Sequence, residues 1–106
     1  MNKWSKEKAN SWYEDHKWIV GCNFLPSSAI NQLEMFQDDT FDLDTIKKEI
    51  TWASDIGFNS LRIYLHDLLW SDKNSFTSKL SLVLDVCASK NIKPILVLFD
   101  DCHRAY

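Results

Sequence analysis

Three short apolar runs, separated by two amphipathic helical patterns, are the feature that most constrains the fold of this chain. The runs 18–22, 60–65 and 94–99 have the length and the apolar content of strands. The first of them, WIVGC, is continuously apolar, as expected of a strand buried on both faces. Between them, residues 43–56 and 76–90 carry apolar side chains at helical spacing. Strands that alternate with helices pair in parallel through right-handed crossovers. The order therefore predicts an α/β fold on a sheet of three parallel strands.

The two inner helices have recognisable start and stop signals. Asp42 is a natural N-cap for the first of them, and Gly57 follows where a left-handed residue is needed. In the second helix, we expect Ser75 to be the N-cap and Asn91 to be the left-handed residue that terminates it.

Two further segments flank the first strand. Residues 4–15 have the pattern of a short amphipathic helix capped by Ser5, and we expect its apolar face to plug a larger structure. Residues 23–40 are largely polar and show no clean period. A loop of this length within a compact domain is usually functional.

The composition restricts the class of partner. The chain has 106 residues and a net charge of −3, and its basic residues are scattered, which argues against nucleic acid or an anionic membrane. No run approaches the roughly 20 apolar residues that span a bilayer. The first residues lack the hydrophobic core and cleavage site of a signal peptide. We therefore expect a cytoplasmic protein, or a secreted or periplasmic one whose signal has been removed.

No motif indicates a cofactor or a metal. The sequence has no glycine-rich phosphate-binding loop and no paired-histidine zinc motif. Its three cysteines, Cys22, Cys87 and Cys102, contain no CxxC pair, and we expect them to be reduced, partly buried thiols. We therefore predict no cofactor and no metal site.

Polar side chains gather where the predicted strands end. In parallel α/β folds, ligands bind at the carboxyl ends of the strands. The opposite ends of these strands offer mainly helix-terminal residues and lysines, so this asymmetry indicates a site. The candidate residues are Asn23, Arg62, His66, Asp67, Trp70 and Asp100.

Each candidate also has a purely structural interpretation. By strand alternation, Arg62 points away from its apolar neighbours, where a structural ion pair would explain it as well as a site would. His66 and Asp67 fit a turn or a helix cap equally well, and Asp100 fits a solvated residue. Trp70 is a candidate platform for stacking a sugar ring, but local packing is the more common role of such a residue.

Three separated blocks of the sequence resemble a known enzyme family. The blocks GCNFLPSSAINQLEMF, DDTFDLDTIKKEITWASDIGFNSLRIYLHDLLW and KPILVLFDDC are similar to the N-terminal third of clan A glycoside hydrolases, which are cellulase-like or xylanase-like (β/α)8 barrels. The similarity runs roughly from Trp4 to Cys102. It implies that residues 1–106 are the N-terminal part of one catalytic domain. This part would be a partial TIM barrel, comprising three parallel strands, their connecting helices and an extra N-terminal helix.

The resemblance implies a retaining hydrolase of β-linked polysaccharides or oligosaccharides, in which two glutamates act as acid/base and nucleophile. In such barrels these glutamates follow the fourth and seventh strands, so no catalytic residue is assigned to this chain. Arg62 matches a strand-two arginine near the nucleophile, which helps to keep that carboxylate ionised. The residues that match positions at the active-site rim are Asn23, Glu34, His66, Asp67 and Asp100.

These implications lead to three hypotheses. In the first, the chain is a fragment that is inactive alone, with a carbohydrate as substrate and the remaining part of the barrel as partner. In the second, it is a small α/β carbohydrate-binding module with covered sheet edges. In the third, it is a subunit that completes a barrel encoded elsewhere. The family usually carries an aromatic residue after FDDC, whereas His103 follows here, which suggests a fragment, a frameshifted gene or an artificial cut.

Overall fold

The computed structural model describes residues 3–16 and 18–98 and shows helices packed on a parallel sheet. The sheet has the strand order β1-β2-β3, and Asn23, Arg62 and Ile95 are neighbours across it. Along the chain the elements are α1 (Lys6–Glu14), β1 (Gly21–Asn23), α2 (Gln32–Phe36), α3 (Leu43–Asp55), β2 (Ser60–Tyr64), the 3-10 helix η1 (Asp67–Asp72), α4 (Lys73–Ser89) and β3 (Lys93–Val97). The predicted α/β class and the parallel pairing are confirmed.

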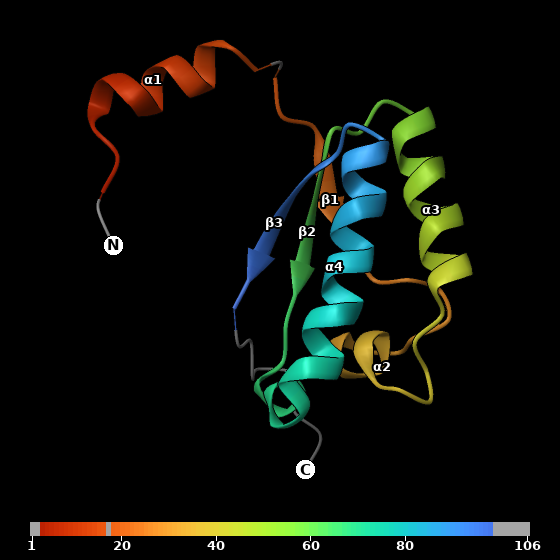
Figure 1. The fold of residues 1–106 in the computed structure, drawn as a ribbon. Coiled ribbons are helices and arrows are strands. Elements are labelled where there is room, and N and C mark those ends of the chain that lie inside the picture. The colour runs from red at the N-terminus through yellow and green to blue at the C-terminus, as the bar shows by residue number, and fades with distance from the viewer. Residues whose placement is uncertain (1–2, 17, 99–106) are drawn as a thin grey trace.

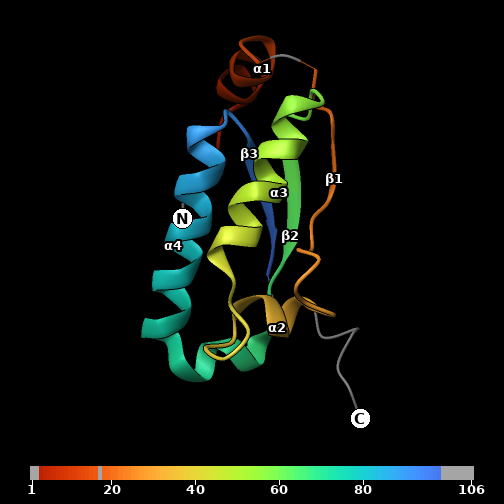
Figure 2. The ribbon, with the colours of Figure 1, turned by 90° about the vertical axis from the view of Figure 1, so that its right-hand side faces the viewer.

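Helices α3 and α4 lie side by side on one face of the sheet (Figures 1 and 2). No helix of the described residues covers the other face, which we call the open face. Leu61 and Ile63 point from β2 toward the helices and are buried. They belong to one apolar cluster with residues from α3 and α4, including Ile46, Ile50 and Val83. All three residues are fully buried. The sheet is therefore stabilised mainly from its helical side.

The predicted cap of α3 is confirmed. The carboxylate of Asp42 accepts hydrogen bonds from the Thr45 backbone N–H at 3.1 Å and from the Thr45 hydroxyl at 2.7 Å. These bonds hold the pKa of Asp42 below its ordinary value, and the bond from the Thr45 hydroxyl has the largest effect. Gly57 follows the helix with φ of 101°, and Asn91 follows α4 with φ of 58°, so both predicted left-handed residues are confirmed.

The predicted cap of α4 is wrong. The helix begins at Lys73 with Asp72 as its N-cap, three residues before the expected start. The 3-10 helix η1 leads directly into α4, so no break in the chain marks the boundary. Ser75 lies within the first turn, and its hydroxyl donates to the carboxylate of Asp38 at 2.7 Å.

The prediction that the first strand is buried on both faces is also wrong. The strand comprises Gly21–Asn23, and Trp18, Ile19 and Val20 before it are 78%, 46% and 43% exposed. An apolar run is buried only where both sheet faces and both neighbouring strands are covered. Here β1 lies at one edge of the sheet, with β2 as its neighbour.

The two flanking segments also differ from expectation. In the polar segment 23–40, α2 forms because Asn31 caps it, while Met35 and Phe36 are buried on the core side. Helix α1 has the predicted cap at Ser5, but none of its residues is buried. It lies beyond the amino end of the sheet (Figure 1), so the described part of the chain does not show the predicted plug.

Two cysteines lie in the described ranges, and both are free thiols. Cys22 is exposed, whereas Cys87 is a buried residue of α4, where desolvation raises the pKa of its thiol to about 11. Cys87 therefore packs as a small apolar residue. Separately, none of the helices in the described part of the chain combines the length and apolarity that crossing a bilayer requires.

Candidate functional site

The open face of the sheet brings two predicted site residues together. Arg62 points away from the helices, opposite to Leu61 and Ile63, as strand alternation predicts. Asn23 is its register partner on β1, so the two side chains share a row on the same face. The Arg62 Nε–H donates to the Asn23 side-chain oxygen at 2.7 Å.

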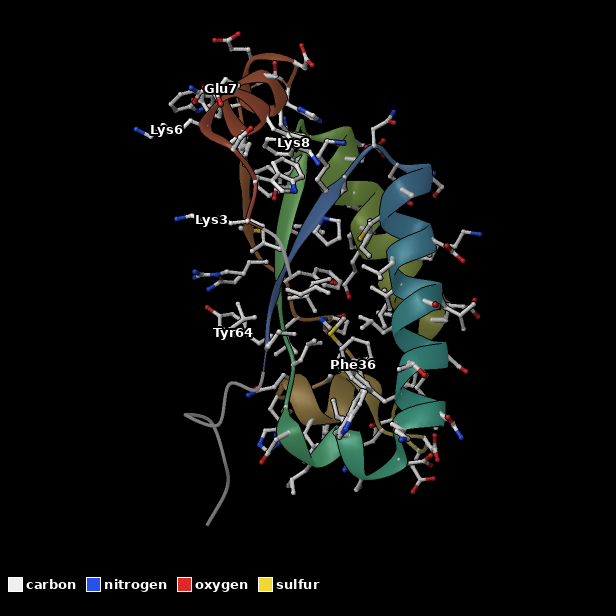
Figure 3. The ribbon with its side chains drawn as sticks, turned by 60° about the vertical axis from the view of Figure 1, so that its left-hand side comes forward. Lys3, Lys6, Glu7, Lys8, Phe36 and Tyr64 are labelled. Atoms are coloured by element: carbon white, nitrogen blue, oxygen red, sulfur yellow. The ribbon has the colours of Figure 1, made fainter. Side chains whose placement is uncertain are left out.

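Tyr64 extends this row along β2. Figure 3 shows its ring on the open side of the sheet, while Phe36 lies between the sheet and the helices. The Arg62 guanidinium carbon lies 5.2 Å from the centre of the Tyr64 ring, within the range of a cation–π contact. We did not predict Tyr64 from the sequence, although its position two residues after Arg62 on a strand would have indicated it.

The electrostatics of the pair leave Arg62 able to bind an anion. A guanidinium has five N–H donors, and the Nε donor is taken by Asn23. Within the described residues, no carboxylate forms an ion pair with Arg62. The structural ion pair, which was one of the two interpretations of Arg62, is therefore not seen among the described residues. The exposed guanidinium can instead bind a carboxylate in a bidentate geometry.

His66 and Asp67 lie below the carboxyl end of β2. His66 is buried, and its Nδ1 accepts the Leu68 backbone N–H at 3.1 Å, which makes it the N-cap of η1. Nδ1 also lies 3.1 Å from a carboxylate oxygen of Asp67. A neutral ring with its proton on Nε2 fits the amide contact, whereas a protonated ring would donate to Asp67 instead. The sequence left open whether His66 is a helix cap or a site residue, and its contacts show the cap.

Glu34 has a local role in the first turn of α2. Its carboxylate accepts the Ile30 backbone N–H at 3.0 Å, and its own N–H donates to the Asn31 side chain at 2.9 Å. This reciprocal arrangement resembles a capping box and orders the start of α2. The Glu34 carbonyl also accepts the Thr40 hydroxyl at 2.5 Å.

Trp70 lies on the outer side of η1 rather than beside Arg62. Its ring meets Phe76 edge-on, with centroids 6.4 Å apart, and half of the residue remains exposed. Local packing and a free indole surface are thus both present. Asp100, the last predicted site residue, lies outside the described residues.

The predicted residues therefore divide into separate groups. Asn23 and Arg62 meet on the open sheet face, whereas His66 and Asp67 meet in η1. Glu34 and Trp70 stabilise α2 and η1, which pack together below the sheet (Figure 1).

Sequence reasoning also missed a polar network on the helical side of the molecule. Asp38 binds the ammonium of Lys79 and the hydroxyl of Ser75 beside a cavity of about 490 Å³. These bonds hold the pKa of Asp38 below its ordinary value, and the bond from Lys79 has the largest effect. Asp38 lies 37 positions from Ser75 and 41 positions from Lys79, so no local sequence pattern indicates the network.

The described residues offer no metal site. No group of three or more His, Cys, Asp or Glu side chains in residues 3–16 and 18–98 is placed to hold a metal ion. The chemistry available on the open face is therefore hydrogen bonding, anion binding by Arg62 and stacking on Tyr64.

Comparisons with protein-family models, curated proteins and solved structures gave no match to this chain. The resemblance to clan A glycoside hydrolases thus stays a prediction made from the sequence.

Proposed function

We propose that this chain is the N-terminal part of a (β/α)8-barrel glycoside hydrolase, and that Asn23 and Arg62 belong to the wall of its substrate site. The observation that carries the proposal is the hydrogen bond between these residues on the open face of the sheet. In a closed barrel this face would be the interior, and the helices would form the outer ring.

The acid/base and nucleophile of this proposal lie outside the chain. Of the four glutamates, Glu7 and Glu14 belong to α1. Glu34 caps α2, and Glu49 accepts the Ser27 backbone N–H and hydroxyl at 2.8 and 2.7 Å. A retaining mechanism needs two carboxyl groups about 5 Å apart across the scissile bond. Arg62 would act by orienting the carboxylate nucleophile and favouring its ionised form.

The open sheet face favours this proposal over a self-contained binding module. Arg62 is exposed on the central strand β2, Ile95 is exposed on the edge strand β3, and Trp18 is exposed before β1. A module that folds and binds sugar alone would be expected to cover its sheet edges. We therefore propose the remaining strands of the barrel as the partner and a β-linked carbohydrate as the substrate.

The first test is to read the encoding DNA beyond Tyr106 in all three frames. The proposal expects about 150 to 250 further barrel residues, with glutamates after the fourth and seventh strands. A stop codon with no such continuation in any frame would remove the enzyme interpretation.

The second test uses the continued chain and an aryl β-glycoside. Arg62→Gln should lower kcat about a hundredfold or more, because an oriented charged donor is lost beside the reacting centre. Arg62→Lys should restore part of the activity and shift the acidic limb of the pH profile upward relative to that of the wild type. The control is Lys48→Gln on the outer side of α3, which should behave as the wild type. Equal effects of the two glutamine variants would contradict the proposed role of Arg62.

A further inference from the structure

A second cavity lies at the amino end of the sheet, opposite to η1 and α2. Its volume is about 590 Å³, which is within the range of small-molecule sites. It lies between the end of α1 and the turn that connects α4 with β3. The described lining includes neither Asn23 nor Arg62, so binding there is tested apart from the proposed function.

One wall of this cavity is aromatic and held in place. The rings of Trp12 and His16 stack with centroids 4.1 Å apart and planes inclined by 25°. The His16 Nδ1–H donates to the Trp12 carbonyl at 2.5 Å, which fixes the imidazole against the indole. Phe58 and Ile95 contribute apolar surface to the lining. The wall thus offers a flat, preorganised surface to a ring.

Most of the uncharged polar groups in the lining already have partners in the protein. The Asn59 side chain accepts the Val20 N–H at 2.8 Å and donates to the Trp18 carbonyl at 2.9 Å. The Ser60 hydroxyl donates to the Lys93 carbonyl at 2.8 Å. These bonds hold the lining of the cavity in place.

The charged groups that remain favour an anion. Lys90 and Lys93 both line the cavity, and their ammonium groups make no ion pair with a described residue. Asp15 is the one carboxylate among the described lining residues. The described lining thus carries two ammonium groups and one carboxylate besides the aromatic wall.

We propose that this cavity binds a small aromatic anion. The ring of the ligand packs on Trp12 and His16, and its negative group binds Lys90 and Lys93. The ligands of this class share an aryl group that carries a phosphate or a carboxylate.

The test is a titration of the full chain, isotope-labelled and followed by amide and indole NMR. The probes are phenyl phosphate, benzyl alcohol as the uncharged ring, and inorganic phosphate as the anion without a ring. Phenyl phosphate should bind tightest and shift the Trp12 indole together with the amides of residues 90–95. The Lys90→Gln, Lys93→Gln double variant should weaken phenyl phosphate about fivefold or more and leave benzyl alcohol unchanged. Trp12→Ala should weaken both, and Asp15→Asn should strengthen phenyl phosphate.

The chain offers a matched control on α3. Lys48 lies 5.2 Å from the ring of the exposed Trp52, so this pair presents the same two groups without the cavity. Lys48→Gln and Trp52→Ala should leave every probe affinity unchanged. The proposal is overturned if phenyl phosphate binds no better than benzyl alcohol, if the α3 variants weaken it equally, or if the shifts centre on Arg62 and Tyr64. The absence of saturable binding would also overturn it.

Discussion

Neighbouring aspartates in this chain have different electrostatic environments. Asp38 and Asp39 adjoin in the sequence and both line the cavity beside α4. Asp38 binds Lys79 and Ser75, whereas no hydrogen bond or ion pair places Asp39 in contact with another described residue. Hydrogen bonds to an ionised carboxylate favour its charged form, which explains the lowered pKa of Asp38.

This difference predicts a specific dependence of stability on acid. The unfolded chain has the ordinary pKa of 3.8 for Asp38, and the folded chain a lower one. The unfolded state therefore binds more protons as the pH falls through that value. The stabilisation from Asp38 is present above the ordinary pKa and is lost as the pH falls toward the folded one. Asp38→Asn should flatten the fall in urea midpoint between about pH 5 and pH 3.

Asp39→Asn is the control for this measurement, because it removes the same charge from the adjacent position. It should leave the acid limb as steep as in the wild type. Added salt should weaken the Asp38 effect, since the Asp38 side chain is 68% exposed to solvent. An equal change in both variants would assign the effect to net charge instead of the Lys79 contact.

At the scale of the elements, two glycines should respond differently to the same substitution. Gly21 lies where β1 approaches β2 closely, and an added Cβ would lie 2.0 Å from the Ser60 carbonyl oxygen. An added Cβ at Gly57 would meet nothing within 4 Å, so the cost there comes from its φ of 101°. A side chain at Gly21 is therefore excluded by lack of space, whereas a side chain at Gly57 is disfavoured by the backbone conformation.

We therefore expect Gly21→Ala to lower the free energy of unfolding by about 2 kcal/mol or more, because the clash is with backbone and β1 must move. Gly57→Ala should cost about 1 kcal/mol. Urea unfolding of both variants gives the comparison, and amide exchange in β1 should accelerate only in Gly21→Ala. A larger loss for Gly57→Ala would contradict the close approach of the two strands.

The elements also show how far the sequence predicts this fold. Helix α3 was predicted with its cap at Asp42 and its end at Gly57, because local signals mark both boundaries. The start of α4 was missed because η1 continues into it, and α2 was missed because five residues are too few to show a helical period.

The candidate site was predictable only in part. The outward direction of Arg62 follows from strand alternation, which is local. Its contact with Asn23 depends on the register between strands whose residues lie 39 positions apart. The cap made by His66 and the packing of Trp70 on Phe76 depend on how η1 lies against the other helices.

At the scale of the whole molecule, the open sheet face carries exposed apolar side chains. Figure 2 shows α3 and α4 together on one side of the sheet. Ile95 is half exposed and is the register partner of Arg62. Trp18 and Leu98 are also exposed near the sheet edges, at 78% and 65%. Exposed apolar faces and unpaired strand edges promote association between chains.

We therefore predict that the purified chain self-associates through this face. Ile95→Thr should raise the dissociation constant about tenfold, because each dimer loses the burial of two apolar side chains. Threonine keeps the β-branched shape that suits a strand, so the fold should be retained. Sedimentation velocity at rising protein concentration gives the constant.

The matched control is Ile56→Thr, which makes the same change at a residue that is 73% exposed at the end of α3, on the helical side. It should leave the dissociation constant within about twofold of the wild type, because a change outside the interface leaves association nearly unaffected. If both variants weaken association equally, the contact is a general apolar one and the open face is not its site. If only Ile95→Thr does so, the face that carries Arg62 is also the face by which the chain recognises other strands. In that case, adding the remaining barrel strands should abolish self-association at the same time as it completes the proposed substrate site.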